Sequence, residues 1–217
     1  MPQSLQSRFA AFACLAASIL LGSANAAFGQ GIPAINEVVP PLGAGVVDQV
    51  GLSTVRLTFS EAVTIAPGAI RAWGVASGPI PLTTSWNAAA NELTVTFIPA
   101  ITAERVTLVV GPGITGEFGD ELDGEVPNPR FPTIPTGDGN AGGVAVFRWD
   151  VLQGDANRDG VTNAADAQAV LAALGTCGIE PLADPDFDAN ADLNVDGCVN
   201  VLDVQILLSG LGGSLPP

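Results

Sequence analysis

Apolar and polar residues alternate in short runs between residues 32 and 151, and glycine and proline separate the runs. In the stretch STVRLTF (53–59), Val55, Leu57 and Phe59 fall on one side and polar residues on the other. An alternation of period two predicts a β-strand with one buried face and one solvent-exposed face. The stretches 92–98 and 105–110 repeat the pattern, and their expected inward residues are Leu93, Val95, Phe97, Val106, Leu108 and Val110.

Four more runs have the composition of strands, at 34–39, 69–75, 81–86 and 143–151. About seven strands over about 120 residues, with turn residues between them, predict an antiparallel β-sandwich. Residues 126–144 are rich in proline and glycine and have no apolar period, which is typical of a connector. We therefore expect a sandwich at 31–125, a connector with the last strand at 126–150, and a second domain at 151–217. The strand at 143–151 could belong to the sandwich or to the connector.

The period changes after residue 151, where apolar residues recur at i, i+3, i+4 and i+7. This spacing predicts two short amphipathic helices that bury a small shared core, and Gly175 is expected to cap the first. The second set follows the first by 37 residues. The two sets are Ala167, Val170, Leu171 and Leu174, and Val204, Leu207, Leu208 and Leu211.

An acidic loop precedes each predicted helix, with the sequences DANRDGVTNAAD from residue 155 and DLNVDGCVNVLD from residue 192. In an EF-hand calcium loop, the side chains at positions 1, 3 and 5 and the main-chain carbonyl at position 7 supply oxygen ligands. Position 6 is glycine, which allows a sharp turn. Position 9 often binds the ion through water, and a carboxylate at position 12 completes the shell. Both loops meet every requirement, although aspartate replaces the longer glutamate at position 12. The duplication favours two Ca²⁺ ions, because Mg²⁺ prefers fewer protein ligands. The alternative is an acidic surface loop without metal.

No helical pattern precedes either loop, so each unit consists of a loop and an exit helix. A duplicated unit of this kind, from about Gly154 to Gly212, resembles the type I dockerin domain. The resemblance implies two bound Ca²⁺ ions and docking into a cohesin-like partner in a polysaccharide-related or cell-surface setting. It implies two ligand sets, which are Asp155, Asn157, Asp159, Val161, Asn163 and Asp166, and Asp192, Asn194, Asp196, Cys198, Asn200 and Asp203. Repulsion among these carboxylates predicts that the domain loses its order without calcium.

The tenth and eleventh loop positions, which face the partner in the dockerin resemblance, are Ala164 and Ala165 in one copy and Val201 and Leu202 in the other. Many cellulosomal dockerins have small hydroxyl residues there. An apolar surface of this kind predicts an interface, either with a cohesin-like or other extracellular protein or with the chain's own sandwich.

Three stretches of the predicted sandwich, VRLTFSEAV (55–63), NELTVTF (91–97) and GDELDGE (119–125), resemble the Ig-like domains of bacterial surface-layer proteins. The resemblance covers residues 33–125 and implies a structural or spacer module. The expected fold is therefore mixed, with an all-β Ig-like sandwich followed by a small all-α pair of calcium loop-helix units.

The first 30 residues have the order of a secretory signal peptide, with Arg8, an apolar run, and Ala24 and Ala26 in an A-x-A arrangement. An uncleaved anchor is the alternative, and no later run is long enough to cross a bilayer. We expect a secreted or cell-surface protein whose Cys177 and Cys198 form a disulfide in an oxidising compartment, with two free thiols as the alternative. Because the chain has no histidine, two cysteines do not supply the four ligands of a usual zinc site.

The net charge of −15 excludes nucleic acid as a partner, because phosphate binding needs a basic face. We expect no enzymatic activity, since histidine, tyrosine and a nucleophile motif are absent from the sequence. The acidic cluster at 117–125 could supply a glycosidase pair but is more typical of a solvated loop; its members are Glu117, Asp120, Glu121, Asp123 and Glu125. Trp73, Trp86 and Trp149 could stack on sugars or belong to the core. The remaining alternatives are a small carbohydrate-binding or carbohydrate-active protein and a surface-structure connector.

Overall fold

The computed structural model describes residues 31–41, 47–48, 51–179 and 183–217. The predicted signal peptide at residues 1–30 lies outside the described residues. Within them, no helix has the length and apolar character needed to cross a membrane.

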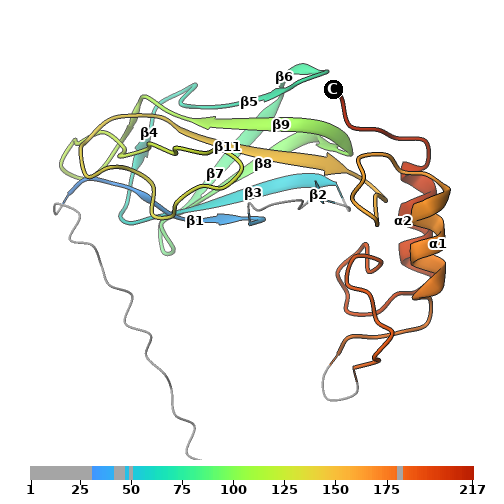
Figure 1. Ribbon diagram of the computed structural model, residues 1–217. Helices are drawn as coiled ribbons and strands as arrows, with labels where there is room; N and C mark the ends of the chain where they lie inside the picture. Colours follow the sequence, from blue (N-terminus) through green and yellow to red (C-terminus); the bar gives the residue numbers. More distant parts are fainter. Residues whose placement is uncertain (1–30, 42–46, 49–50, 180–182) are drawn as a thin grey trace, which may run out of the picture.

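Two β-sheets face each other and form the sandwich (Figure 1). The four-stranded sheet is antiparallel and has the order β1-β3-β8-β7. Its strands are β1 (Ile35–Val39), β3 (Leu52–Phe59), β8 (Glu92–Ile101) and β7 (Leu82–Asn87). The five-stranded sheet has the order β2-β11-β9-β5-β6, and β11 is parallel to β2 and antiparallel to β9. Its strands are β2 (Val47–Asp48), β11 (Ala145–Leu152), β9 (Ala103–Val110), β5 (Ile70–Gly74) and β6 (Gly78–Ile80). A two-stranded sheet pairs β10 (Ile114–Thr115) with β4 (Thr64–Ile65).

The alternation in the sequence predicts the inward faces of the long strands correctly. Val55, Leu57 and Phe59 of β3 are at most 2% exposed, and the predicted inward residues of β8 and β9 are at most 3% exposed. Phe147 and Trp149 of β11 join the same core. Burial of these apolar faces between the two sheets stabilises the sandwich, because it removes a continuous apolar surface from water.

The segment rich in proline and glycine is bound to the sandwich along its length. Thr136 is fully buried, and it exchanges hydrogen bonds of 3.0 Å with the backbone of Ile35 in β1. Its hydroxyl also donates to the carbonyl of Asp123 at 2.8 Å. Further along, the amide of Arg148 in β11 donates to the carbonyl of Pro129 at 2.9 Å. These contacts hold the segment as a fixed loop over one edge of the sandwich.

Two helices make up the regular structure of the second domain and lie side by side beyond the end of β11 (Figure 1). They are α1 (Ala164–Ala172) and α2 (Val201–Gly210). Their small core contains Val170, Leu193 and Leu207, together with Ala156, Ala173, Ala191 and Val199.

The predicted apolar stripes are only half right. Val170 and Leu207 are buried, whereas Leu171, Leu174, Leu208 and Leu211 are 47–61% exposed. Helix α1 ends at Ala172 with Ala173 as its C-cap, so Gly175 lies beyond the cap that the sequence assigns to it. Gly175 adopts φ +91° there, and its amide donates to Val199 at 2.8 Å.

The chain passes from β11 into the second domain without a spacer. Leu152 ends β11 and is buried, and the next amide, of Gln153, donates to Thr102 at 2.8 Å. Gly210, the last residue of α2, packs directly against the backbone of Gln153, so that a Cβ on Gly210 would lie 2.0 Å from the carbonyl oxygen of Gln153. Asp155, the first residue of the acidic loop, is therefore fixed directly to the end of a sandwich strand.

Candidate calcium loops and docking faces

The first acidic loop folds around the carboxylate of Asp155, which is fully buried. Its Oδ1 accepts a hydrogen bond from the amide of Asp159 at 3.1 Å, and its Oδ2 accepts one from Gly160 at 2.9 Å. The amide of Asp159 also donates to Oδ1 of Asn157 at 2.9 Å. Gly160 has φ +89°, a conformation that favours glycine, which explains why the sixth position of the loop is glycine.

The end of this loop is also the beginning of α1. Asn163 is the N-cap, and its side-chain oxygen accepts from Ala165 at 2.7 Å. Asp166 is buried at the N3 position and accepts from the amide of Asn163 at 2.7 Å and from that of Asn157 at 3.0 Å. The capping box joins the ninth and twelfth loop positions, and the second carboxylate oxygen of Asp166 ties the third position to them.

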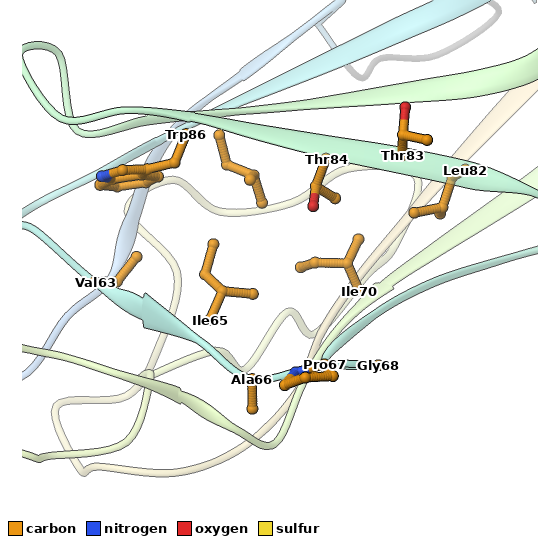
Figure 2. A pocket seen from close by; sticks show the side chains of 11 residues that line it. Val63, Ile65, Ala66, Pro67, Gly68, Ile70, Leu82, Thr83, Thr84 and Trp86 are labelled. Atoms are coloured by element: carbon orange, nitrogen blue, oxygen red, sulfur yellow. The ribbon is translucent and has the colours of Figure 1, made fainter.

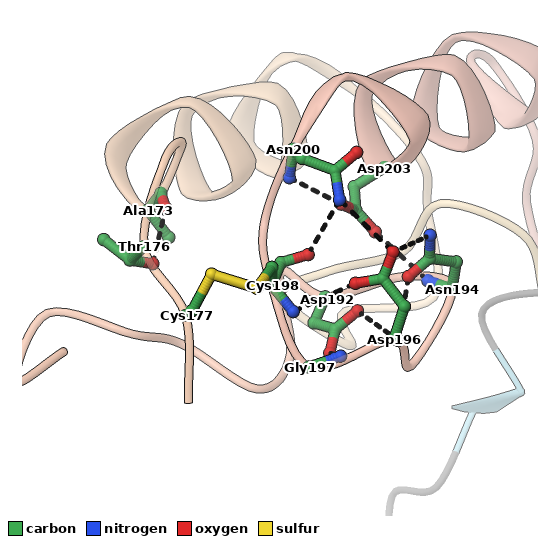
Figure 3. The surroundings of a disulfide bond; sticks show 10 residues. All are labelled: Ala173, Thr176, Cys177, Asp192, Asn194, Asp196, Gly197, Cys198, Asn200 and Asp203. Carbon is green, nitrogen blue, oxygen red and sulfur yellow. Dashed lines mark hydrogen bonds between the residues drawn. A yellow bond between two sulfur atoms is a disulfide. The ribbon is translucent and has the colours of Figure 1, made fainter. Parts of the chain in front are cut away.

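The second loop repeats this arrangement (Figure 3). Asp192 accepts from the amides of Asp196 at 3.1 Å and Gly197 at 2.8 Å. Asp203 accepts from Asn200 at 2.7 Å and from Asn194 at 3.1 Å. The structure thus brings the side chains of each predicted ligand set into one loop.

Each loop buries two aspartate carboxylates away from solvent. Asp155, Asp166 and Asp203 are fully buried, and Asp192 is 4% exposed. Burial raises the pKa of Asp155, and the neighbouring carboxylates of Asp166 and Asp159 raise it further, against the lowering effect of the amides of Gly160 and Asp159. Hydrogen bonds from Asn194 and from the amide of Cys198 lower the pKa of the exposed Asp196.

Oxygen donors of this number and type fit Ca²⁺, a hard cation that takes six to eight oxygen ligands. The main-chain carbonyls of Val161 and Cys198, at the seventh position, are each held by an asparagine side chain, with Asn163 Nδ2 and Asn200 Nδ2 both at 3.3 Å. A bound cation would offset the repulsion between the buried carboxylates.

The predicted disulfide joins Cys177, just after α1, to Cys198 in the second loop. Backbone hydrogen bonds surround it: Gly178 donates to Gly197 and Val199 donates to Thr176, both at 2.9 Å. The chain after the first helix and the seventh position of the second loop are therefore joined both covalently and by a short β-bridge.

The four residues at the tenth and eleventh loop positions, Ala164, Ala165, Val201 and Leu202, are all exposed. They are therefore not packed against the sandwich, which was the alternative to a partner. Leu171 and Leu208 lie two turns further along the same helix faces than Ala164 and Val201, and they are 58% and 61% exposed. Each helix thus presents an apolar face to solvent, and the two faces occupy matching positions of the repeat.

The acidic cluster of the sandwich divides into an exposed and a buried part. Glu117, Asp120 and Glu121 are exposed. Asp123 is 1% exposed, and its two oxygens accept from the amides of Asp138 and Gly139, both at 2.8 Å. Its carboxylate therefore holds two loops together.

Glu125 lies close to Asp123 and Asp138, with a carboxylate oxygen of each within 4.8 Å of the others. Burial raises the pKa of Glu125, and Asp123 and Asp138 raise it further.

The three tryptophans do not form a common platform. Trp149 is 3% exposed in the core, and its indole donates to Pro40 at 3.3 Å. Trp86 of β7 packs partly against the core and lines an open hollow of about 680 Å³, into which Thr84 also points (Figure 2). Trp73 of β5 is 40% exposed and lies in the other sheet.

These features define a protein with a β-sandwich and a C-terminal pair of calcium-type loop-helix units. The family model of the dockerin type I domain matches residues 153–211. The C-terminal part of the chain is therefore a type I dockerin domain, a class that occurs in extracellular and cell-surface proteins. This domain supports a role in protein docking, and its family implies calcium binding.

No curated protein matches the chain. A solved structure with some similarity is a C-terminal interface mutant of a type II cohesin–X-dockerin complex from Acetivibrio cellulolyticus. The match has 14% sequence identity and a TM-score of 0.26, and it covers 70% of this chain and 90% of the other. A TM-score this low does not establish a common fold.

Proposed function

We propose that this is a secreted, non-catalytic protein that binds two Ca²⁺ ions and docks through the exposed faces of α1 and α2 to a cohesin-like extracellular partner. The observation that carries the proposal is the duplication of an apolar face at matching positions. Leu171 and Leu208 lie 37 residues apart in the repeat, and both are more than half exposed. A soluble domain that keeps leucine at such positions in both copies has a surface suited to an interface.

Calcium sets the geometry of these faces. In each loop the twelfth residue, Asp166 or Asp203, is a proposed Ca²⁺ ligand and also the N3 residue of the capping box. A metal ion held there fixes the first turn of the helix and with it the direction of Ala164 or Val201. Removing the metal would therefore disturb the docking face directly.

The two faces have different chemistry at the start of the helix. The first has the small Ala164 and Ala165, and the second has the larger Val201 and Leu202. The larger side chains offer more apolar surface. We therefore expect the α2 face to bind more tightly to a flat apolar partner and the α1 face to accept a partner with a protruding side chain.

Pull-down by an immobilised panel of cohesin modules, with and without Ca²⁺, tests this function. Leu171→Asp and Leu208→Asp should each weaken capture, and the double variant should abolish it. Val75→Asp changes an exposed apolar residue of the sandwich, 55% exposed, and is the matched control. Capture that survives both the double variant and a chelator would refute docking through these faces.

A further inference from the structure

Arginines gather on the outer face of the five-stranded sheet, although the chain carries a net charge of −15. Arg71 of β5, Arg105 of β9 and Arg148 of β11 each lie between inward-facing buried residues, so their side chains point away from the core. Arg130 joins them from the loop beside β11 through its ion pair with Asp150. Four of the seven basic residues of the chain thus lie on this one face.

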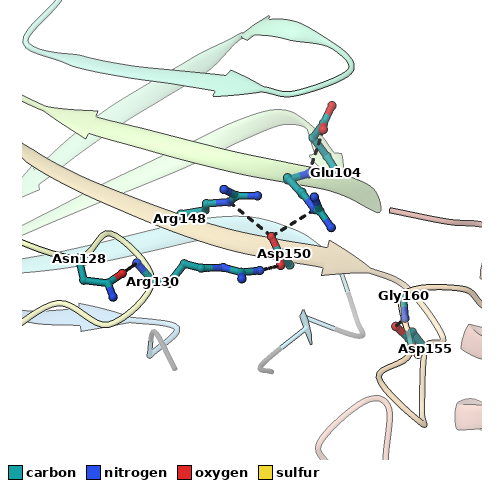
Figure 4. A network of polar contacts seen from close by, with 8 residues as sticks. Glu104, Asn128, Arg130, Arg148, Asp150, Asp155 and Gly160 are labelled. Atoms are coloured by element: carbon teal, nitrogen blue, oxygen red, sulfur yellow. Dashed lines mark hydrogen bonds and ion pairs between the residues drawn. The ribbon is translucent and has the colours of Figure 1, made fainter. Parts of the chain in front are cut away.

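Three of these arginines surround a single carboxylate. Arg130 pairs with Oδ2 of Asp150, while Arg105 Nε and Arg148 Nε lie 3.8 Å and 3.6 Å from its Oδ1 (Figure 4). The side chain of Asp150 is 12% exposed. One carboxylate neutralises one guanidinium, so the cluster keeps two positive charges.

The guanidinium groups of Arg105 and Arg148 have unused hydrogen-bonding capacity. Both Nε atoms, and Oδ1 of Asp150, are covered and have no hydrogen-bond partner among the described residues. The side chains of Arg105 and Arg148 are still 30% and 33% exposed. A ligand does not reach the covered Nε atoms, but it can meet the exposed part of these two side chains, which their contacts with Asp150 already hold in place, and this reduces the entropy cost of binding.

An exposed aromatic ring lies in register with this cluster. Trp73 of β5 is paired with Thr107 of β9, and Thr107 is paired with Arg148 of β11. Two strand spacings separate Trp73 from Arg148, or roughly 10 Å. The guanidinium carbon of Arg71 lies 5.7 Å from the centroid of the Trp73 ring and holds that ring at the edge of the basic region.

We propose that this face binds an acidic sugar chain that carries carboxylates, such as a polyuronate. A uronate carboxylate lies against Arg105, Arg130 and Arg148, because a planar guanidinium matches a carboxylate with two parallel hydrogen bonds. A neighbouring sugar ring stacks its C–H face on the indole of Trp73.

The charge of the face favours this ligand over other polyanions. Nucleic acid needs many phosphate contacts to overcome repulsion, and four arginines on a chain of net charge −15 do not supply them. Another protein with an acidic surface is the second alternative, and it would bind best where the arginines border a hollow that can take apolar side chains of the partner. The hollows at Trp86 and at Ile98 have none of the four arginines in their lining. The site is separate from the dockerin domain and does not depend on the docking function.

Isothermal titration of the mature full-length chain with a short oligogalacturonate tests the proposal. The neutral oligogalactoside of the same length is the control ligand. We expect binding of the acidic chain that weakens with salt, and a dissociation constant about tenfold higher in Arg148→Gln or Arg130→Gln, since each removes one charge-assisted contact. Trp73→Ala should weaken binding as well.

Arg56→Gln is the matched control variant, because Arg56 lies on the other sheet and pairs with Glu92 at 3.4 Å. The proposal is overturned if the wild-type chain does not bind the oligogalacturonate, if the neutral ligand binds equally, or if Arg56→Gln weakens binding as much as Arg148→Gln. The alternative is that the face is a contact between copies of the chain. The proposal is also overturned if the wild type does not bind the glycan and sedimentation shows that Arg148→Gln abolishes self-association. Trp73→Ala changes an exposed side chain and keeps the test open if Arg148→Gln does not fold. Calcium uptake should be unchanged in all these variants, which separates this test from that of docking.

Discussion

Val161 of the first loop forms an antiparallel β-bridge with Ser214 of the C-terminal tail. Around it, Thr162 donates to Gly213 at 2.9 Å and Gly212 donates to Thr162 at 2.8 Å. These positions correspond, at the offset of 37 residues, to the bridge between Cys198 and Cys177. The domain thus has an internal two-fold symmetry in which a disulfide stands on one side and a non-covalent bridge on the other.

This symmetry predicts that a second disulfide can be introduced. The double variant Val161→Cys, Ser214→Cys should form it, because the native pair has the same bridge with a Cα–Cα distance of 4.0 Å. Closing a loop of about fifty residues should stabilise the domain by up to about 4 kcal/mol. Thermal unfolding with and without reductant measures the gain, and each single variant is a control. Mass mapping that finds the new cysteines reduced would contradict the symmetry argument.

Calcium uptake should require the twelfth position of each loop. Asp166→Asn should remove one site and Asp203→Asn the other, so that calorimetry counts one ion in each single variant and two in the wild type. The reason is that the carboxylate closes the oxygen shell, while asparagine keeps one acceptor oxygen for the capping hydrogen bond at the start of the helix. Asp120→Asn, which changes an exposed acid of the sandwich, is the control. An unchanged count of two in Asp166→Asn would refute the proposed ligand set.

Two adjacent leucines should separate stability from docking. Leu207 is 2% exposed in the domain core, so Leu207→Ala should cost roughly 2–5 kcal/mol of unfolding free energy. Leu208 is 61% exposed, and Leu208→Ala should stay within about 0.5 kcal/mol of the wild type while it weakens capture by a partner. Chemical denaturation of the calcium-loaded chain compares them. Equal losses of stability would contradict the burial seen in the structure.

Glu104 should contribute to the pH dependence of the sandwich. Burial raises the pKa of this carboxyl, but hydrogen bonds from the amides of Ala76, Ser77 and Arg105 outweigh burial and lower the pKa below its ordinary value of 4.5. A lowered pKa in the folded state means that the contribution is fully present above pH 4.5 and is lost as the pH falls through the folded value. Glu104→Gln should therefore lose on the order of 2 kcal/mol at pH 7.

The difference between wild type and Glu104→Gln should shrink below pH 4.5, which urea unfolding at several pH values checks. Glu121→Gln, an exposed residue, serves for comparison. A difference that stays constant down to pH 3 would show that the charge of Glu104 does not contribute.

The long strands were predictable because each carries its own inside-outside pattern. Every predicted inward residue of β3, β8 and β9 is buried. The short strands β4, β6 and β10, of two or three residues, have too few positions to show a period. The candidate calcium loops were recognisable since all their proposed ligands are local in sequence, within twelve residues.

The remaining features depend on contacts between distant residues. The apolar period of α1 includes both Val170 and Leu171, and it does not tell which of the two faces the core. The arginine cluster was missed because it joins Arg105, Arg130 and Arg148 around Asp150 through strand register and a loop, and no local motif marks it. A partial sequence signal is the outward position of arginine in four predicted strands, of which the three with Arg71, Arg105 and Arg148 belong to this sheet.

The dockerin domain is attached to the end of β11, an inner strand whose eight residues pair with β9 over their whole length. If a docked partner were pulled while the sandwich was held, the tension would reach the sandwich through β11. The hydrogen bonds between β11 and β9 would then be loaded in shear and would have to break together, whereas the bonds of an edge strand pulled away sideways break one after another. Under such a load the sandwich would serve as the anchor, and the strand that ends at Leu152 would transmit the force from the dockerin domain to the core.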